Sequence, residues 1–335
     1  MHRFVRSRRV AGAVVAAAAF VVLPTAAQAD PQFYETPLFG LATAPGNALY
    51  VADAGQGVVD ADTGRLVAAL AGVNDVAPMG RSSMWAVTTT DTDAAVHRIE
   101  GRGTRKIAST LEFENTVDPA GDGTEEGSNP FDLARLTGGQ VLVADAAGNS
   151  LLHVHQEKGI DWVATFPTQP LPCPVEICGP GVVIPAHAVP TSVVVGPDGA
   201  YYVGELTGFP FTPGESRIWR IEPGTRHAAC GTSPACSVVA DDLTAIIDLQ
   251  FGPDGRLYVA QLDDAGLLAF ESGTGAGGSI RACNVATGDC DVVASGIQML
   301  TAIAFRGSTI WHTEWSLVPE EAPPPFAADV VPLTP

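Results

Sequence analysis

Basic residues are scarce in this sequence of 335 residues. It holds 18 Lys and Arg against 37 Asp and Glu, which gives a formal net charge of −19 at pH 7. Proteins that bind nucleic acid or anionic membrane surfaces hold the phosphate groups with Lys and Arg. We therefore expect neither as a partner, and we interpret the acidic composition mainly as a solvated surface.

The sequence also lacks an apolar run of the roughly 20 residues that span a bilayer. The run from Val10 to Leu23 has fourteen residues, follows four arginines and precedes Ala27-Gln28-Ala29. This order is typical of a secretory signal peptide, here 1–29, with cleavage after Ala29. A membrane anchor is the weaker alternative, and twin-arginine export stays open beside the general route. We expect a mature chain 30–335, secreted or in the cell envelope of a bacterium, with no integral membrane segment.

Several catalytic motifs are missing. The chain has no Gly-x-Ser-x-Gly elbow and no His-Glu-x-x-His pair. "GTGAGG" at 273–278 matches a dinucleotide-binding pattern, but no strand-turn-helix context surrounds it, so we predict a flexible loop. His153 and His155 share one face of a predicted strand and are better explained as surface residues than as metal ligands.

Six cysteines occur in three close couples. In an exported chain, an even set of this kind predicts a disulfide framework. A zinc site is the alternative, but zinc ligands are usually closer in sequence and converge with further ligands. We predict the local bridges Cys173–Cys178, Cys230–Cys236 and Cys283–Cys290.

One unit recurs along the chain: an apolar strand, a tight turn and a second strand rich in Tyr, Val and Trp. Its clearest copies are "TSVVVGPDGAYYVGE" at 191–205 and "IDLQFGPDGRLYVAQ" at 247–261. Two further strand-like runs follow each hairpin, so four strands recur about every 40 to 60 residues, as in a β-propeller. We predict an all-β fold, a six-bladed β-propeller of four-stranded antiparallel blades in one domain, residues 30–335. The predicted blades are 33–70, 71–114, 128–166, 189–243, 245–297 and 298–335.

The last blade lacks a strand, because residues 316–335 are Pro-rich and offer only "ADVVPL". We predict that N-terminal residues near Phe33 to Leu38 supply its outer strand.

Four segments carry a resemblance to a known family: "SNPFDLARL", "VLVADAAGNSLLHV", "VPTSVVVGPDGAYYVGELTGFPF" and "IIDLQFGPDGRLYV". They resemble the ScyD/ScyE family of secreted propeller proteins with NHL-like repeats, over roughly residues 33 to 315. The resemblance implies a six-bladed fold and export. It brings no catalytic residues, and the three cysteine couples and the irregular last blade depart from the family pattern.

Aligning the copies places one residue of each at the start of the innermost strand. These residues are Gly40, Asp75, Asp132, Ser192, Asp248 and Ala302. The three aspartates either accept backbone N–H groups of the neighbouring blade or converge on a cation such as Ca²⁺, which prefers carboxylate oxygens. No other cofactor is expected.

A second set lies at the end of the next strand: Asp53, Thr88, Asp145, Glu205, Gln261 and Glu314. Both sets border one face of an antiparallel propeller. Blade four inserts Phe209, Pro210 and Phe211 on that face, as an aromatic lip over a ligand or as a cover for core. For the acidic loop with Asp118, Asp122, Glu125 and Glu126 we expect solvation rather than cation binding.

We therefore expect a monomeric exported propeller that binds an unknown small molecule, glycan or envelope protein, with Phe209, Phe211, Glu205 and Asp145 as candidate contacts. The alternative is a Ca²⁺-dependent lactonase or esterase similar to gluconolactonase-type propellers, with Asp132 and Asp248 as ligand or base. A structural protein of the cell envelope is a third interpretation. No residue pattern demonstrates catalysis.

Overall fold

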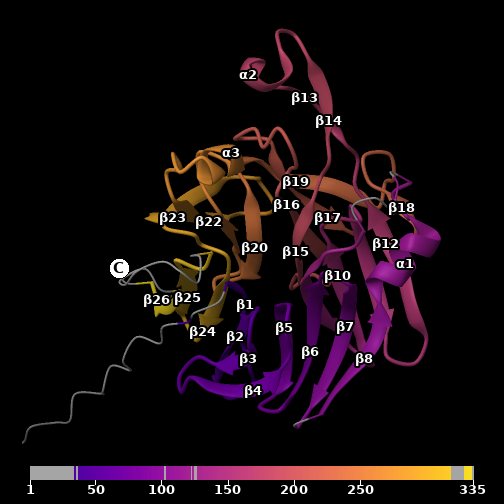
Figure 1. Cartoon of the computed structure of the whole chain (residues 1–335), viewed down its shortest axis with the longest axis vertical. Coiled ribbons are helices and arrows are strands. Elements are labelled where there is room, and N and C mark those ends of the chain that lie inside the picture. Colours follow the sequence, from indigo (N-terminus) through magenta and orange to yellow (C-terminus); the bar gives the residue numbers. More distant parts are fainter. Residues whose placement is uncertain are drawn as a thin grey trace, which may run out of the picture. The chain divides into compact units, whose positions relative to one another are not determined.

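The computed structural model describes residues 34, 37–101, 103–121, 123, 127–317 and 328–333. The predicted signal peptide lies outside these residues. Small antiparallel sheets follow one another along the chain and form a six-bladed β-propeller (Figure 1), which confirms the predicted fold. Within the described part, no helix is long and apolar enough to cross a membrane.

The first three blades are built from strands that are consecutive in the chain. Blade 1 holds β1 (Leu38–Thr43), β2 (Leu49–Asp53), β3 (Gly57–Asp60) and β4 (Arg65–Ala69). Blade 2 holds β5 (Val73–Gly80), β6 (Ser83–Thr90), β7 (Asp93–Glu100) and β8 (Gly103–Ser109). Blade 3 holds β9 (Pro130–Leu136), β10 (Gln140–Asp145), β11 (Ser150–His155) and β12 (Gly159–Thr165).

Blade 4 departs from this pattern because a short extra strand interrupts it, blade 5 follows the pattern, and blade 6 has three strands among the described residues. Blade 4 holds β15 (Pro190–Val195), β16 (Tyr201–Glu205), β17 (Ser216–Ile221) and β19 (Cys236–Leu243); between the last two, β18 (Ala228–Ala229) joins the sheet of blade 3. Blade 5 holds β20 (Ile246–Phe251), β21 (Leu257–Gln261), β22 (Gly278–Cys283) and β23 (Cys290–Ile297). Blade 6 holds β24 (Ile303–Arg306), β25 (Thr309–Glu314) and β26 (Asp329–Pro332).

The repeated Gly-Pro-Asp-Gly stretches form the tight turns that the sequence predicts. In blade 4, Gly196 N–H donates to the carbonyl of Ala200 at 2.8 Å, and Asp198 accepts the N–H of Ala200 at 3.1 Å. These local hydrogen bonds satisfy the backbone polar groups of the turn, where the strand-to-strand hydrogen bonds end. The first two strands of blades 4 and 5 pair directly from these turns and shift register only near the start of the innermost strand.

Short helices interrupt the strands, although the sequence showed no helical pattern. They are α1 (Thr110–Val117), α2 (Val175–Cys178) and α3 (Leu267–Glu271). By the spacing of blade 3, where five residues separate Asp145 from Leu151, the sequence predicts that Leu267 begins the third strand of blade 5. That prediction is wrong, because Leu267 begins α3 and the strand begins at Gly278. Segments this short depend on local capping and packing more than on an amphipathic repeat, so periodicity does not find them.

The N-terminal segment attaches to the last blade. Tyr34 forms an antiparallel bridge with Ala328, just before β26, and its N–H donates to the Ala328 carbonyl at 3.0 Å. The N–H of Leu38 donates to the carbonyl of Ser316 at 3.1 Å. Tyr34 thus pairs with the residue before β26 of the last blade, whereas Leu38 begins β1 of blade 1. The described residues show a single bridge here, and an outer strand from Phe33 to Leu38 stays a prediction.

Tyr34 also offers a test of this closure. Its ring is buried, but its hydroxyl has no hydrogen-bond partner among the described residues, and an unsatisfied buried hydroxyl contributes no stability. We expect Tyr34→Phe to change the free energy of unfolding by less than about 0.5 kcal/mol, whereas Tyr34→Ala loses the ring packing and costs roughly 2–4 kcal/mol. Chemical denaturation of both variants checks this, and equal losses would contradict the packing role of the ring.

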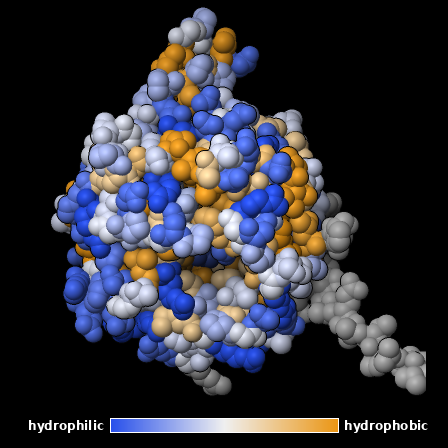
Figure 2. Space-filling view, turned by 180° about the vertical axis from the view of Figure 1, so that it is seen from behind, coloured by the Kyte–Doolittle hydropathy of each residue, from blue (hydrophilic) through white to orange (hydrophobic). Residues whose placement is uncertain are grey.

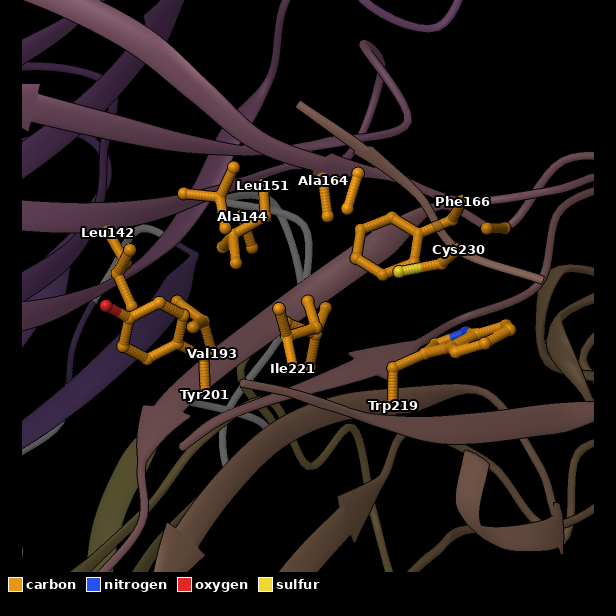
Figure 3. Packing of buried hydrophobic residues seen from close by; sticks show 14 of the residues in the cluster. Leu142, Ala144, Leu151, Ala164, Phe166, Val193, Tyr201, Trp219, Ile221 and Cys230 are labelled. Carbon is orange, nitrogen blue, oxygen red and sulfur yellow. The ribbon is translucent and has the colours of Figure 1, made fainter. Parts of the chain in front are cut away.

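The hydrophobic core is divided among the interfaces between blades. Figure 3 shows the cluster between blades 3 and 4, where Leu142, Leu151, Tyr201 and Trp219 face one another from neighbouring sheets. These side chains lie on strands that the repeat predicted, with one face of each sheet packed on its neighbour. Packing between sheets therefore fixes where the innermost strands lie around the axis.

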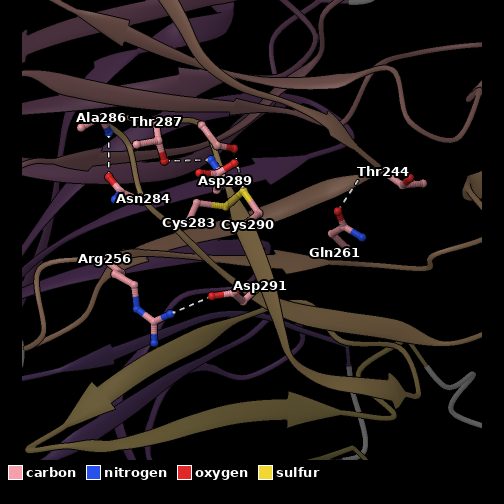
Figure 4. Close-up of a disulfide and its surroundings, with 11 residues drawn as sticks. Thr244, Arg256, Gln261, Cys283, Asn284, Ala286, Thr287, Asp289, Cys290 and Asp291 are labelled. Carbon is pink, nitrogen blue, oxygen red and sulfur yellow. Dashed lines mark hydrogen bonds and ion pairs between the residues drawn. A yellow bond between two sulfur atoms is a disulfide. The ribbon is translucent and has the colours of Figure 1, made fainter.

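All three predicted disulfides are present. The Cα–Cα distances are 5.9 Å for Cys173–Cys178, 5.3 Å for Cys230–Cys236 and 4.0 Å for Cys283–Cys290. The last joins the facing ends of β22 and β23, next to the exposed ion pair of Arg256 and Asp291 (Figure 4). Three disulfides are consistent with an extracytoplasmic location.

Candidate functional site

Three aspartates from three different blades share one central cavity. Asp75 lies on β5, Asp132 on β9 and Asp248 on β20, all on innermost strands. The cavity has a volume of about 300 Å³, and backbone and side chains from blades 1 to 5 line it. The sequence alignment therefore brought together residues that do lie side by side around the propeller axis.

Each aspartate is hydrogen-bonded to the blade that follows it in space. Asp75 Oδ2 accepts the N–H of Leu133 at 3.3 Å, and Asp132 Oδ2 accepts the N–H of Val193 at 2.6 Å.

The third bond has the same form, because Asp248 Oδ2 accepts the N–H of Ile303 at 2.7 Å. Asp132 and Asp248 also accept the N–H of the next residue on their own strands. These bonds tie blade 2 to 3, 3 to 4 and 5 to 6, which is the structural role expected for such residues.

Gly40 stands at the equivalent position of blade 1, next to Asp75. A Cβ at Gly40 would overlap with Asp75 Oδ1 and lie 2.7 Å from the Asn74 carbonyl oxygen. The missing side chain thus leaves room for the carboxyl group of Asp75. A glycine here is needed for close approach between blades 1 and 2.

Burial changes the acidity of all three carboxyl groups. Burial raises the pKa of Asp75 well above its usual range, and the adjacent charge and hydrogen bond of Asp132 raise it further. Burial raises the pKa of Asp248 in the same way, and the charge of Asp132 adds to it.

Asp132 behaves differently within this group. Burial raises its pKa as well, but the hydrogen bond from Asp75 and the N–H groups of Val193 and Leu133 oppose the shift. Since two carboxylates this close cannot both ionise easily, the pair Asp75 and Asp132 favours sharing one proton in a hydrogen bond. The floor of the cavity therefore presents both hydrogen-bond donors and acceptors.

The predicted Ca²⁺ site is not formed by these side chains as they stand. Among the residues that the structure describes, no three His, Cys, Asp or Glu side chains are arranged to hold a metal ion. The aspartate oxygens point instead to backbone N–H groups. A metal at Asp75, Asp132 and Asp248 stays a prediction.

The cavity extends toward the turns between the first and second strands. Its lining continues from the aspartates along the C-terminal halves of the innermost strands, to Thr43, Arg135, Val195 and Gln250. Arg135 is exposed and donates to the Pro78 carbonyl at 3.1 Å. The rim of the cavity is therefore polar, and its walls between rim and floor are largely apolar.

On the opposite side of the aspartates, aromatic rings fill the channel. Phe39 and Phe131 contact edge to face, with their ring centroids 5.7 Å apart, and Ile247 lies beside the small remaining space of about 10 Å³. Each precedes the residue that the alignment placed at the aspartate level. The sequence did not predict this plug, although the position before the aspartate level is apolar in these three blades.

The predicted ligand contacts lie on the plugged side. Asp145 and Glu205 are fully buried. Asp145 accepts bonds from Ser128 Oγ and from the N–H groups of Asn129 and Gly148. It thus caps the loop after its strand.

Glu205 is held by a cation and an indole. It accepts two bonds from Arg217, at 2.9 and 3.1 Å, and one from Trp219 Nε1. Burial raises its pKa, and the guanidinium of Arg217 opposes that shift. Both carboxylates are used within the protein, and their contact with a ligand stays a prediction.

The Phe209 loop packs across blades 4 and 5. Phe209 and Phe211 contact edge to face at 6.0 Å, and 37% of Phe209 is exposed. A Cβ at Gly266 would lie 2.7 Å from the Phe211 carbonyl oxygen, so the loop lies directly against the long connection 262–277 of blade 5. Phe211 is half-buried, so Phe209 is the more exposed of the two rings.

The remaining candidates are separate from the cavity. His153 is buried, so the prediction that it is a surface residue is wrong; it is hydrogen-bonded to Gln140 Oε1, and burial lowers its pKa. His155 Nδ1 accepts the N–H of Glu157. Asp118 accepts the N–H of Gly121. Asp122, Glu125 and Glu126 lie outside the described residues.

Comparisons with known proteins support the fold. No family model and no curated protein matches the sequence. Among solved structures, the PQQ-bound form of an aldose sugar dehydrogenase from Streptomyces coelicolor is 14% identical, with a TM-score of 0.57 over 90% of this chain and 94% of that chain.

Two lyase structures are similar as well. A streptogramin B lyase is 13% identical, with a TM-score of 0.53 over 91% of this chain and 87% of that chain. A catalytically inactive virginiamycin B lyase from Staphylococcus aureus, with quinupristin, is 13% identical, with a TM-score of 0.51 over 85% and 81%. At these identities the likeness shows the propeller fold alone.

Proposed function

We propose that this chain is an exported propeller that binds a small, uncharged, hydroxyl-rich molecule in its central cavity. The observation that carries the proposal is a cavity of about 300 Å³ whose floor is made of three aspartates, of which Asp75 is buried and the other two are half-buried. A volume near 300 Å³ is at the lower end for small-molecule sites, so it suits a ligand about the size of a monosaccharide. We also propose that the chain is exported and related to the ScyD/ScyE proteins. Export is supported by the signal-peptide pattern of 1–29, and the relationship by the four segments quoted above.

The charge of the floor selects the ligand class. An anion would meet the negative charge that the pair Asp75 and Asp132 keeps when it shares one proton, so it is disfavoured. A cation would find carboxylate oxygens already bonded to backbone N–H groups and two carboxyl groups that favour protonation. An uncharged molecule with several hydroxyl groups can both donate to and accept from such a floor.

A screen of thermal unfolding tests this proposal. We expect a panel of neutral sugars and polyols to contain compounds that raise the Tm of the mature protein, because binding to the folded state alone stabilises it. Gln250→Trp places an indole at the polar rim and should abolish that rise. Val292→Trp, at an exposed position of β23, is the matched control and should keep it.

Two outcomes of the screen would count against the cavity. A stabilising compound that acts equally on Gln250→Trp binds elsewhere. A second panel of sugar acids and other anions that raises the Tm when the neutral panel does not would contradict the assigned ligand class. Isothermal titration of the best compound gives the stoichiometry, for which the proposal requires one site per chain.

A Ca²⁺-dependent lactonase or esterase is the second candidate, because three carboxyl groups do converge in one cavity. It requires the aspartates to turn from their backbone partners toward a cation. Calcium titration with a chelator control, on wild type and on Asp132→Asn/Asp248→Asn, separates the two. A calcium-dependent rise in Tm that the variant loses would favour the hydrolase over the neutral-ligand site.

A further inference from the structure

A hairpin between blades 3 and 4 projects from the propeller and ends in an apolar tip. Within the described part of the chain, its strands β13 (Gln169–Pro172) and β14 (Val183–Ala186) pair only with each other, and α2 lies between them. Figure 1 shows this hairpin clear of the blades, and Figure 2 shows apolar residues gathered on it. The exposed fractions are 58% for Val175, Ile177 and Val183 and 38% for Val182.

The hairpin is built to present side chains rather than strand edges. Pro170 lies opposite Pro185 in the pair, and Pro172 follows on β13, and prolines interrupt the edge hydrogen bonding that would add another strand. The Cys173–Cys178 bond closes the loop around α2 and fixes the tip before any partner arrives.

A groove lined by apolar and basic side chains lies between blades 1 and 2. It has a volume of about 590 Å³ and is lined by β4 from Arg65 to Ala69, by Arg81 and Ser82 of the β5–β6 turn, and by Gly101. Leu66, 44% exposed, contributes apolar surface. Arg65 and Arg81 stand at this groove, and neither forms an ion pair with the residues that the structure describes.

The tip and the groove complement each other in charge and polarity. On the tip, the exposed carboxylate of Glu176 lies between the apolar side chains of Val175 and Ile177; in the groove, apolar side chains lie beside two guanidinium groups. Two arginines at one groove are unusual in a chain with twice as many acidic as basic residues. We propose that the hairpin tip of one copy docks in this groove of a second copy.

The positions of the two surfaces define the type of assembly. The hairpin connects the last strand of one blade to the first strand of the next, whereas Arg81 and Gly101 lie in turns at the other end of their blades. Figure 1 accordingly shows the hairpin and β4 at opposite ends of the view. A contact between different surfaces is heterologous and repeats from copy to copy, so the association is head to tail. It replaces the expectation of a monomer and does not depend on the cavity ligand.

Sedimentation velocity of the mature chain, from micromolar to submillimolar concentration, tests the proposal. We expect the average mass of the wild type to rise with concentration. Glu176→Arg and the pair Arg65→Glu/Arg81→Glu should each weaken association at least about tenfold, because each places like charges at the contact. Glu157→Arg, a charge reversal in an exposed turn, is the matched control and should associate like the wild type.

Mixing the two variants gives the decisive result. In an equimolar mixture, the basic tip of the Glu176→Arg variant meets the acidic groove of the other variant. The unchanged tip of that other variant meets the unchanged groove of the first, so association should return. A wild type that stays monomeric at every concentration would overturn the proposal. So would variants that associate normally, or a mixture that associates no better than its components.

Discussion

Replacing Asp132 with alanine is expected to lower the free energy of unfolding by about 2–4 kcal/mol, because the N–H of buried Val193 loses its acceptor, which lies at 2.6 Å. The N–H of Leu133 loses its bond to Asp132 as well and keeps only the bond to Asp75 at 3.3 Å. The bond to Val193 also joins blade 3 to blade 4, so its loss weakens an interface between sheets. Chemical denaturation at neutral pH measures the change.

Asp132→Asn is the matched control. The amide keeps one oxygen that can accept the N–H of Val193 and removes a charge from a buried site, so we expect a loss below about 1 kcal/mol. Equal losses in the two variants would show that the charge of Asp132, rather than its hydrogen bonds, matters for stability. An alanine variant as stable as the wild type would contradict the role of the aspartates as ties.

The second large effect is a pH dependence of stability that comes from the cavity floor. Asp75 and Asp248 have pKa values raised well above the usual range. Between about pH 4, where carboxyl groups of the unfolded chain ionise, and the raised values, the folded protein holds protons that the unfolded chain releases. The stabilisation from these groups is therefore complete below about pH 4 and is lost as the pH rises through the folded pKa.

The difference between wild type and Asp75→Asn/Asp248→Asn isolates this contribution. Histidines act in the opposite direction, since burial lowers the pKa of His97 and lowers that of His312 to about 4, but both proteins contain them. We expect the Tm of the wild type relative to the variant to be highest at mildly acidic pH and to fall toward pH 8. A difference that is flat with pH would mean that the aspartates ionise normally.

The sequence predicted the ring of blades because its signal repeats. The turn of Gly-Pro-Asp-Gly and the aromatic second strand recur in register, so one alignment located β15, β16, β20 and β21 together with the level of the three aspartates. The disulfides could also be predicted from the sequence, since the two cysteines of each couple lie within one turn or hairpin. The helices and the connection 262–277 of blade 5 were not, because they occur once and have no repeat to reveal them.

The face of the propeller to which the cavity opens was harder to predict than the position of the aspartates along the channel. The acidic residues at strand ends predicted a ligand site on one face of the propeller. On that face, Asp145 and Glu205 are fully buried and hydrogen-bonded within the protein. Whether a carboxylate faces solvent or caps a loop depends on residues distant in sequence, such as Ser128 for Asp145 and Trp219 for Glu205. The plug of Phe39 and Phe131 likewise depends on two blades meeting across the axis.

The measurement that tests the account most directly is the protonation of the cavity floor at neutral pH. Infrared spectroscopy distinguishes a protonated carboxyl group from an ionised one, and Asp75→Asn and Asp248→Asn assign the signals. The account predicts protonated carboxyl bands in the wild type near pH 7, and each variant should lose its own. A spectrum in which every carboxyl group is ionised at that pH would contradict a floor that donates hydrogen bonds to an uncharged ligand, and it would favour a cation in the cavity.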